Sequence, residues 1–282
     1  MVSLTQARRP ADLLRGLESL GRQQGVRLDI VCVGNGADPG HLPEGVRVVV
    51  LPENVGIPAG RNRGAEAVSG EFVFFLDDDA SLPSATFLAD AAAMLRDEPA
   101  IGLLQPRVTD PTGSVDPRRW TPRMHKGDPR ESSDVFSVWE GATLLPRDVF
   151  DACGGWGEPY FYAHEGIELA WRVWAQGRRV RYAAELVAEH PAIDPARHSQ
   201  YYRLNARNRV WLAKRNLPWP LVPVYVASWT GVQVLRWATK PTRLRPWFEG
   251  WREGWKRSPG GRRSMGWRTV WRMTRAGRPP LI

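Results

Sequence analysis

An apolar run that stops at three consecutive carboxylates constrains this chain more than any other feature. Phe72–Leu76 has the composition of a buried strand, and Asp77, Asp78 and Asp79 follow it at once. Adjacent carboxylates repel one another unless a cation neutralises them, and oxygen ligands are those that Mg²⁺ and Mn²⁺ prefer. An isolated acidic triplet is more often a solvated turn. The surrounding sequence therefore has to decide between a turn and a metal site.

A glycine-rich segment upstream favours the metal site. Asn54–Gly64 reads N-V-G-I-P-A-G-R-N-R-G, a loop that leads into a helix. Its glycines allow the backbone to approach a ligand closely, and the guanidinium of Arg61 suits a diphosphate. A loop of this kind next to an acidic strand end indicates a site for a phosphorylated ligand and a cation.

Strands and helices alternate through the first two thirds of the chain. Apolar periodicity predicts strands at 2–4, 28–33, 46–51, 71–76 and 102–108, and helices at 10–20, 58–69 and 84–97. Such alternation implies a mainly parallel α/β sheet, in which ligands collect at the carboxyl ends of strands. Gly34 and Asp77 stand at such ends. The segment 109–134 is rich in Pro, Gly, Arg and Asp and is predicted to be a loop.

Residues 2 to about 190 resemble a family 2 glycosyltransferase of the GT-A fold, a Rossmann-like mixed sheet flanked by helices. That family carries an N-x-G-x-x-x-G-R-N-x-G segment followed by an apolar strand ending in D-x-D. Gly154–Trp156, Tyr160–Tyr162 and Glu165–Arg172 resemble its G-G-F/W, F/Y-F and E-D-x-[DE]-L-x-x-R motifs. Each motif alone is weak, but their order and spacing together are specific.

The resemblance implies a nucleotide diphosphate sugar donor and a Mn²⁺ or Mg²⁺ cofactor. Asp77 and Asp79 are the expected metal ligands, with His190 as the third, and Asp78 is expected at the donor ribose or sugar. A lone histidine such as His190 is more often structural than metal-binding. Its place in the family pattern makes the two interpretations equally favoured. The other residues expected at the donor are Asn35, Asn54, Gly56, Arg61 and Asn62.

The general base is the point at which the sequence departs from the family. Glu165, Glu168 and Arg172 fall on one face of a predicted helix, and the resemblance makes one of the two glutamates the expected base. The family's Asp at the second position of the E-D pair is Gly166 here. Either Glu165 takes the role, another acid does, or activity is altered. A purely structural alternative has the glutamates capping the helix and pairing with Arg172.

Acceptor contacts are expected from two further segments. Trp139, Glu140 and Gly141 match a segment that the family places beside the donor sugar and acceptor, although Trp139 fits core packing equally well. Arg207 lies in Asn205–Arg209, which resembles the Y-R-N-R segment of rhamnosyl- and galactofuranosyl-type members. The resemblance makes Arg207 an expected substrate contact, together with Arg172 of the Glu165–Arg172 segment. A helix surface without such a contact is the alternative. A second departure from the family is Gly34, since the family has an acid there that contacts the nucleotide. The sequence therefore does not determine which nucleotide the donor carries.

The basic charge of the chain is concentrated in its last part. The formal net charge is +9, but residues 1–235 carry 26 Lys and Arg against 28 Asp and Glu, and residues 236–282 carry 13 against two. Six of the 14 Trp also lie in residues 236–282, with Trp247, Trp251 and Trp255 at helical spacing and Trp267 and Trp271 likewise. Tryptophan on one face among cations is typical of a helix in the headgroup region of an anionic membrane.

Two other interpretations of this tail are open, namely packing on the catalytic domain or on a second copy, and binding of nucleic acid. We favour the membrane and expect no nucleic-acid partner. Leu221–Leu235 is apolar but shorter than the roughly 20 residues of a membrane span, so we expect an interfacial helix.

The sequence therefore predicts a catalytic domain over residues 1–215 and a helical, basic and aromatic tail over 216–282. Within the domain, the nucleotide-binding half is expected at about 1–105 and the acceptor half at about 106–215. Two cysteines without a pairing pattern and the absence of a signal-type segment favour a cytoplasmic protein, peripheral at the inner face of the plasma membrane.

The expected activity is inverting, metal-dependent transfer of a sugar to a cell-surface glycan or a lipid-linked acceptor. A non-catalytic or regulatory donor-binding subunit is the alternative, because Gly34 and Gly166 both replace expected acids. A sugar-phosphate nucleotidyltransferase is disfavoured because its glycine-rich, lysine-containing N-terminal signature is absent.

Overall fold

The computed structural model describes residues 1–113, 116–123, 127–194 and 200–281. Within them the strands are β1 Val2–Thr5, β2 Ile30–Asn35, β3 Val46–Leu51, β4 Phe72–Asp77, β5 Ile101–Thr109, β6 Ser133–Asp134, β7 Ala142–Pro146 and β8 Arg179–Glu189. The helices are α1 Pro10–Gly21, α2 Ile57–Ala67, α3 Phe87–Asp97, α4 Arg147–Cys153, α5 Glu165–Ala175, α6 Tyr201–Asn216, α7 Leu221–Trp237, α8 Pro241–Lys256 and α9 Trp267–Arg275.

The strands form one mixed sheet in the order β3-β2-β1-β4-β7-β5-β8-β6. Strands β1 to β4 run parallel to one another, and β7 lies antiparallel between β4 and β5. The register pairs Leu4 of β1 with Asp77 of β4, and Thr5 of β1 with Gly34 of β2. The carboxyl ends of three parallel strands therefore meet at one edge, which is where the acids lie.

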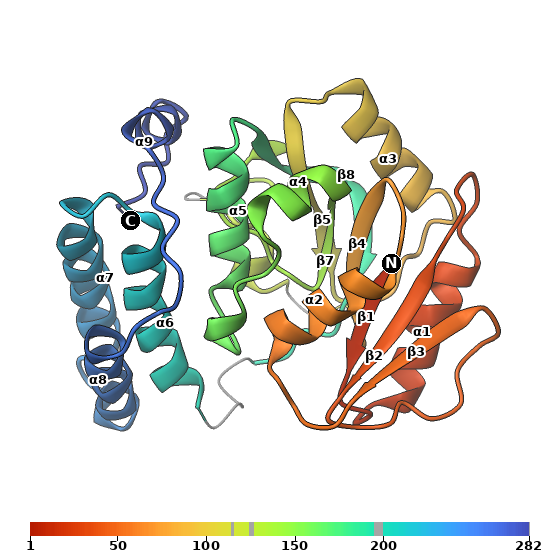
Figure 1. The fold of residues 1–282 in the computed structure, drawn as a ribbon, viewed down its shortest axis with the longest axis horizontal. Coiled ribbons are helices and arrows are strands. Elements are labelled where there is room, and N and C mark those ends of the chain that lie inside the picture. Colours follow the sequence, from red (N-terminus) through yellow and green to blue (C-terminus); the bar gives the residue numbers. More distant parts are fainter. Residues whose placement is uncertain (114–115, 124–126, 195–199, 282) are drawn as a thin grey trace.

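Helices cover both faces of this sheet (Figure 1). On one face α1 and α3 pack on alternate strand residues such as Cys32 and Phe74. On the other face α2, α4 and α5 pack on residues such as Val33 and Phe75. Both faces of the central strands are buried, which explains why β2 and β4 are nearly continuous apolar runs. Both cysteines are free and buried, as expected.

Most predicted elements are confirmed, with shifts at their ends. The strand expected at 28–33 is Ile30–Asn35, and the helix expected from residue 84 begins at Phe87. The predicted loop at 109–134 is largely irregular but contains a 3₁₀ turn at Arg118–Trp120 and the short β6. Residues 114–115 and 124–126 of that loop lie outside the described residues.

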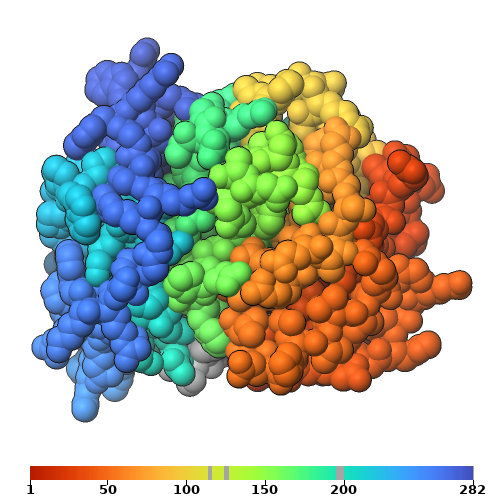
Figure 2. Space-filling view, viewed as in Figure 1, coloured from red at the N-terminus to blue at the C-terminus, as the bar shows by residue number. Residues whose placement is uncertain are grey.

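The C-terminal part is helical, as predicted, and packs closely on the domain. Helix α8 lies so near α6 that a Cβ atom at Gly250 would come within 1.9 Å of the Arg203 carbonyl oxygen. The chain then returns to the domain, where the Met265 amide donates to the Asn216 carbonyl at 2.9 Å. Figure 2 shows this segment, in blue, beside the green part of the catalytic domain.

The tryptophans of the tail divide into two groups. On α8, Trp247 is buried at 2 % exposure, Trp251 is half-buried and Trp255 is 37 % exposed, so the packing alternative holds for Trp247 and in part for Trp251. On α9, Trp267 and Trp271 are 57 % and 63 % exposed. Among the described residues, no helix has the length and apolar character that crossing a bilayer requires.

Candidate active site

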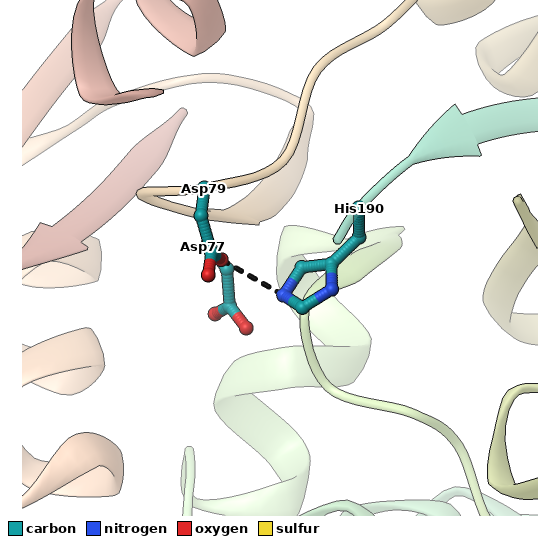
Figure 3. Close-up of side chains that lie close together, drawn as sticks. All are labelled: Asp77, Asp79 and His190. Atoms are coloured by element: carbon teal, nitrogen blue, oxygen red, sulfur yellow. Dashed lines mark ion pairs between the residues drawn. The ribbon is translucent and has the colours of Figure 1, made fainter. Parts of the chain in front are cut away.

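The acidic end of β4 and the end of β8 bring three candidate metal ligands together. Figure 3 shows Asp77 and Asp79 facing His190, whose imidazole Nε2 donates to Asp79 Oδ1 at 2.8 Å. One ligand atom from each of the three residues lies within 4.8 Å of the others. Two carboxylates and an imidazole at this spacing fit Mn²⁺ or Mg²⁺, so the expected ligand set is assembled.

Arginines and hydroxyls surround the acids. Arg61 donates to Asp77 Oδ1 at 2.6 Å, and Arg9 pairs with Asp79. Thr5 donates its hydroxyl to Asp78 Oδ2 at 2.6 Å. The contacts of Thr5 and Arg9 were not expected from the sequence, since neither residue belongs to a motif.

Protonation differs across the triplet. Burial opposes ionisation of Asp79, but its hydrogen bond with His190 and the charges of His190 and Arg9 outweigh burial and lower its pKa. For Asp78 burial dominates and raises the pKa to about 6, with the charges of the neighbouring acids adding to the rise. Asp79 is therefore the better anionic ligand of the two, as the D-x-D pattern implies.

These acids open into a cleft of about 900 Å³, the size of a site for a substantial ligand. The expected site residues that line it are Asn54, Gly56, Arg61, Asp77, Asp78, Asp79, Trp139, Glu140, Gly141, Glu165 and His190. The other expected site residues, which do not line it, are Asn35, Asn62, Glu168, Arg172 and Arg207.

Two glutamates, the buried Glu165 and the half-buried Glu140, stand beside the candidate metal ligands. Glu140 Oε1 accepts from the Gly166 amide at 2.9 Å, in the first turn of α5. A Cβ atom at Gly166 would lie only 2.4 Å from that oxygen and 2.6 Å from the carboxyl carbon. The Glu140 side chain thus occupies the space that a side chain at position 166 would need. Burial and the neighbouring Glu140 raise the pKa of Glu165 to about 8.

Glu168 is enclosed in a buried ion network instead of facing the cleft. Its carboxylate is fully buried and pairs with Arg172 at 2.9 Å and with Arg215 at 2.6 Å. Tyr160 and Asn216 donate to Glu168 Oε1 at 3.0 and 2.8 Å. With both oxygens engaged, Glu168 and Arg172 join α5 to α6. This geometry favours the structural alternative for both residues over the base and substrate roles expected of them.

Two expected donor residues support the donor loop from behind. Asn35 donates to Asn54 Oδ1 and to the Gly56 carbonyl, and accepts from the Val55 amide. Asn62 donates to the Trp156 carbonyl at 3.0 Å and accepts from the Trp156 amide at 2.9 Å, which ties α2 to the Gly-Gly-Trp turn. These asparagines shape the loop that lines the cleft.

The expected nucleotide-contacting acid is absent for a steric reason. A Cβ atom at Gly34 would come within 2.0 Å of the Ala37 carbonyl oxygen, because the chain turns back directly after β2. Any side chain at position 34 would require this turn to move.

Trp139 and Gly141 lie next to the candidate metal ligands. The Trp139 ring meets the His190 ring edge-on at 4.8 Å. Gly141 accepts from the Asp77 amide at 2.8 Å, and a Cβ atom there would collide with the Trp139 ring at 2.0 Å. Trp139 packs on core residues and also lines the cleft, so its position is compatible with both interpretations, and its contact with substrate stays a prediction.

The loop before α5 has unusual backbone geometry. Phe161, Ala163 and His164 have φ values of 64°, 68° and 77°, which side-chain-bearing residues rarely adopt. Asn208 of α6 stabilises the loop by donating to carbonyls of Tyr162 and Ala163 at 2.7 and 2.9 Å. Arg207 donates to the Tyr160 carbonyl at 2.8 Å, so it supports this loop.

Comparison with known proteins identifies the family. The sequence model described as Glycosyl transferase family 2 matches residues 7–154, more than half of the chain. The chain belongs to glycosyl transferase family 2. The matched part of this family 2 member contains the acidic triplet and Glu140, whereas His190 and α5 lie beyond it.

The family 2 chain matches parts of longer proteins. It is 25 % identical over 185 residues to the O-antigen biosynthesis protein RfbC of Myxococcus xanthus, covering 57 % of this chain and 14 % of that one. It is 27 % identical over 153 residues to a pre-mycofactocin glycosyltransferase of Mycobacterium tuberculosis, covering 51 % and 32 %. The chain thus spans no more than about a third of these relatives.

Solved structures share its GT-A fold. GalNAc-T7 with UDP, GalNAc and Mn²⁺ superposes with a TM-score of 0.64 at 15 % identity, covering 99 % of this chain and 57 % of that one. Staphylococcus aureus TarS 1–349 in complex with UDP-GlcNAc gives 0.61 at 14 %, covering 88 % and 78 %. The Pyrobaculum calidifontis mannosyltransferase PcManGT with GDP-Man and Mn²⁺ gives 0.54 at 18 %, covering 75 % and 61 %.

Proposed function

We propose that this protein is an inverting, metal-dependent glycosyltransferase that moves a sugar from a nucleotide diphosphate donor to a glycan or lipid-linked acceptor of the cell surface. The observation that carries the proposal is the convergence of Asp77, Asp79 and His190 beside the Glu140–Glu165 pair in one cleft. Metal ligands next to protonatable acids are what transfer from a diphosphate leaving group requires.

The donor would lie over the carboxyl ends of β1, β2 and β4. Asp77, Asp79 and His190 would hold Mn²⁺ or Mg²⁺, which when bound would neutralise negative charge on the diphosphate. The neighbouring Arg61 is nearly buried and has an unpartnered Nη1, so it can donate to a diphosphate oxygen. Relatives in complex with UDP, UDP-GlcNAc and GDP-Man support a donor of this class.

Glu140 is the general base in this proposal. A base must reach the proton of the acceptor hydroxyl, and Glu140 lines the cleft beside Asp77 while Glu168 does not. Burial raises the pKa of both acids, to about 8 for Glu165, while the charge of Arg61 and the Gly166 amide favour the ionised form of Glu140. The acceptor hydroxyl gives its proton to Glu140, its oxygen attacks the anomeric carbon, and the carbon–oxygen bond to the diphosphate breaks in line.

Helix α9 would place the enzyme at an anionic membrane surface. Thr269 and Met273 bury one face of α9, and Trp267 and Trp271 project from the other beside exposed Arg268 and Arg275. Exposed indoles and cations on one helix suit an interfacial helix. An acceptor attached to a membrane lipid would be brought to the cleft by this contact.

The non-catalytic alternative rests on the glycines at positions 34 and 166. Glu140 supplies a carboxylate in the space of a side chain at position 166, which favours an active enzyme. Binding of a donor in the absence of any transfer or hydrolysis would favour the alternative.

Thermal unfolding with a panel of nucleotide sugars, each with and without Mn²⁺ or Mg²⁺, tests the proposed function. A ligand that binds only the native state adds about 2.7 kcal/mol at a hundredfold excess over its Kd. We expect one donor to raise Tm in the presence of metal, and Asp79→Ala to lose this effect. Asp148→Ala, which removes an exposed carboxylate of α4, is the matched control. No metal-dependent shift with any donor would contradict the proposal.

A further inference from the structure

A buried arginine on the helical wall of the cleft lacks an acidic partner. Arg209 of α6 is only 9 % exposed and lines the cleft. Its Nη1 donates to the Tyr225 hydroxyl at 3.0 Å, and its guanidinium stacks on the Trp229 ring at 3.8 Å. Among the residues that the structure describes, no carboxylate pairs with Arg209, and its Nε has no partner. A buried, uncompensated charge is costly, so a structural role alone accounts poorly for it.

Two other residues that line the cleft carry buried nitrogen atoms with no hydrogen-bond partner in the part of the chain that the structure describes. His164, at the start of α5, is 5 % exposed, and neither of its ring nitrogens has a partner. The Trp229 indole nitrogen of α7 is buried and also unpartnered. Both residues line the cleft with Arg209. Burial, and then the charge of Arg209, keep the pKa of His164 well below its ordinary value, so its imidazole is neutral and has one N–H that can donate.

Further arginines add hydrogen-bond donors to this wall of the cleft. Arg236 of α7 is exposed and lines the cleft, and no carboxylate of the described chain pairs with it. Arg119, on the loop across the cleft, also lines it and donates to the Ile193 carbonyl. The carboxylates of the cleft are instead gathered at the sheet edge and at Glu140 and Glu165. Arg61 and Arg9 pair with acids at the sheet edge, whereas Arg209 and Arg236 have no carboxylate partner among the described residues.

We propose that Arg209, Trp229 and His164 form a phosphate-binding subsite on the acceptor side of the cleft, so that the acceptor carries a phosphate group. Guanidinium, indole and imidazole N–H groups donate without offering a competing anion, and a guanidinium matches phosphate oxygens with two parallel bonds. Arg209 and Trp229 belong to α6 and α7, at the end of the molecule away from β2 and β3 (Figure 1), whereas His164 follows a segment that meets the expected donor loop, since the Ile57 amide donates to the Phe161 carbonyl at 2.8 Å. The assignment to the acceptor rests on the proposed function.

Calorimetric titration of the full chain with inorganic pyrophosphate in the presence of EDTA tests the subsite, because chelation removes any contribution of metal at Asp77 and Asp79. We expect Arg209→Met to weaken pyrophosphate binding about tenfold or more. Trp229→Phe, which keeps a stacking ring and removes only the N–H donor, should weaken it by a smaller factor. Arg252→Met, which removes an exposed arginine of α8 outside the cleft, is the matched control and should bind as the unmodified protein does.

A second titration, with UDP and with GDP in the presence of Mn²⁺, separates the two possible sources of the phosphate. Unchanged nucleotide binding by Arg209→Met, together with lost pyrophosphate binding, supports an acceptor phosphate. A tenfold loss of nucleotide binding would overturn that assignment and give the subsite to the donor. Pyrophosphate binding that survives both Arg209→Met and Trp229→Phe would overturn the subsite itself. Failure of both nucleotides to bind, with Arg209-dependent pyrophosphate binding intact, would count against the proposed function and not against the subsite.

Discussion

The carboxylate of Glu140 lies in the space that any side chain at position 166 would have to enter. The Gly166 amide donates to Glu140 at 2.9 Å, and a Cβ atom on Gly166 would fall 2.4 Å from the same oxygen. Glycine at 166 and glutamate at 140 are therefore sterically linked. Position 166 of α5 lacks the family's Asp, and the carboxylate of Glu140, from the segment before β7, lies in the space beside it.

This relationship predicts what happens when the carboxylate at position 140 is removed and when one is introduced at position 166. Glu140→Gln keeps an acceptor for the Gly166 amide but removes the base, and we expect turnover to fall by about 10²–10⁴. Gly166→Asp alone should be destabilised by about 1–3 kcal/mol, because the new side chain overlaps the Glu140 carboxylate.

The double variant Glu140→Ala/Gly166→Asp is the decisive member of the set. It removes the overlap and returns a carboxylate to the same space, so it should exceed Glu140→Ala in kcat and recover the Tm lost by Gly166→Asp. A folded double variant that is no more active than Glu140→Ala would count against Glu140 as the base.

Glu168 is predicted to act on stability. Removing one partner of a buried ion network costs about 3–5 kcal/mol, so Glu168→Gln should lose about that much in denaturant unfolding at pH 7. Burial opposes ionisation of Glu168, but Arg172 and Arg215 outweigh it and hold its pKa below the ordinary 4.5. The contribution is thus present above pH 4.5 and is lost as pH falls through the folded-state value. A stability difference that grew on acidification would contradict this sign.

Gly34→Ala tests the steric account of the missing nucleotide-contacting acid. The added methyl group would meet the Ala37 carbonyl at 2.0 Å, so we expect a lower Tm and weaker donor binding. Gly21→Ala is a suitable control because a Cβ atom at Gly21, at the end of α1, meets nothing within 4 Å. Equal Tm values for the two variants would show that the turn after β2 yields easily.

Membrane association is predicted to depend on α9. Substituting both Trp267 and Trp271 by alanine should reduce sedimentation with vesicles that contain anionic lipid, and added salt should reduce it further. Trp247→Phe on the buried side of α8 provides a comparison in which the exposed surface is unchanged. Equal sedimentation of the α9 variant and the unmodified protein would exclude α9 as the membrane contact.

Local sequence was sufficient to predict the parallel core and the acidic edge. A continuous apolar run such as Phe72–Leu76 can only be buried as a strand covered on both faces, and strand direction then places Asp77 at the ligand edge. The same reasoning anticipated the helix that begins at Glu165, because the spacing of its residues is a local property.

The roles of the two α5 glutamates could not be read from spacing. Glu165 and Glu168 are three residues apart on one helix, yet one lines the cleft and the other is enclosed by Arg172 and by Arg215 of α6. That difference depends on where α6 packs, which involves residues nearly 50 positions away. The tail behaves similarly, since only packing against α6 distinguishes the buried Trp247 from the exposed Trp267.

The sequence by itself determined the fold class, the family resemblance and the three candidate metal ligands, because each rests on a local pattern of apolar runs, glycines and acids. Only the tertiary structure decided that Glu140 fills the space at Gly166, that Glu168 is structural in its contacts, and that Arg209 is buried without an acid. The physical reason is that the ionisation and role of a carboxylate or guanidinium are set by the groups that surround it in space. Those groups come from elements that are distant along the chain.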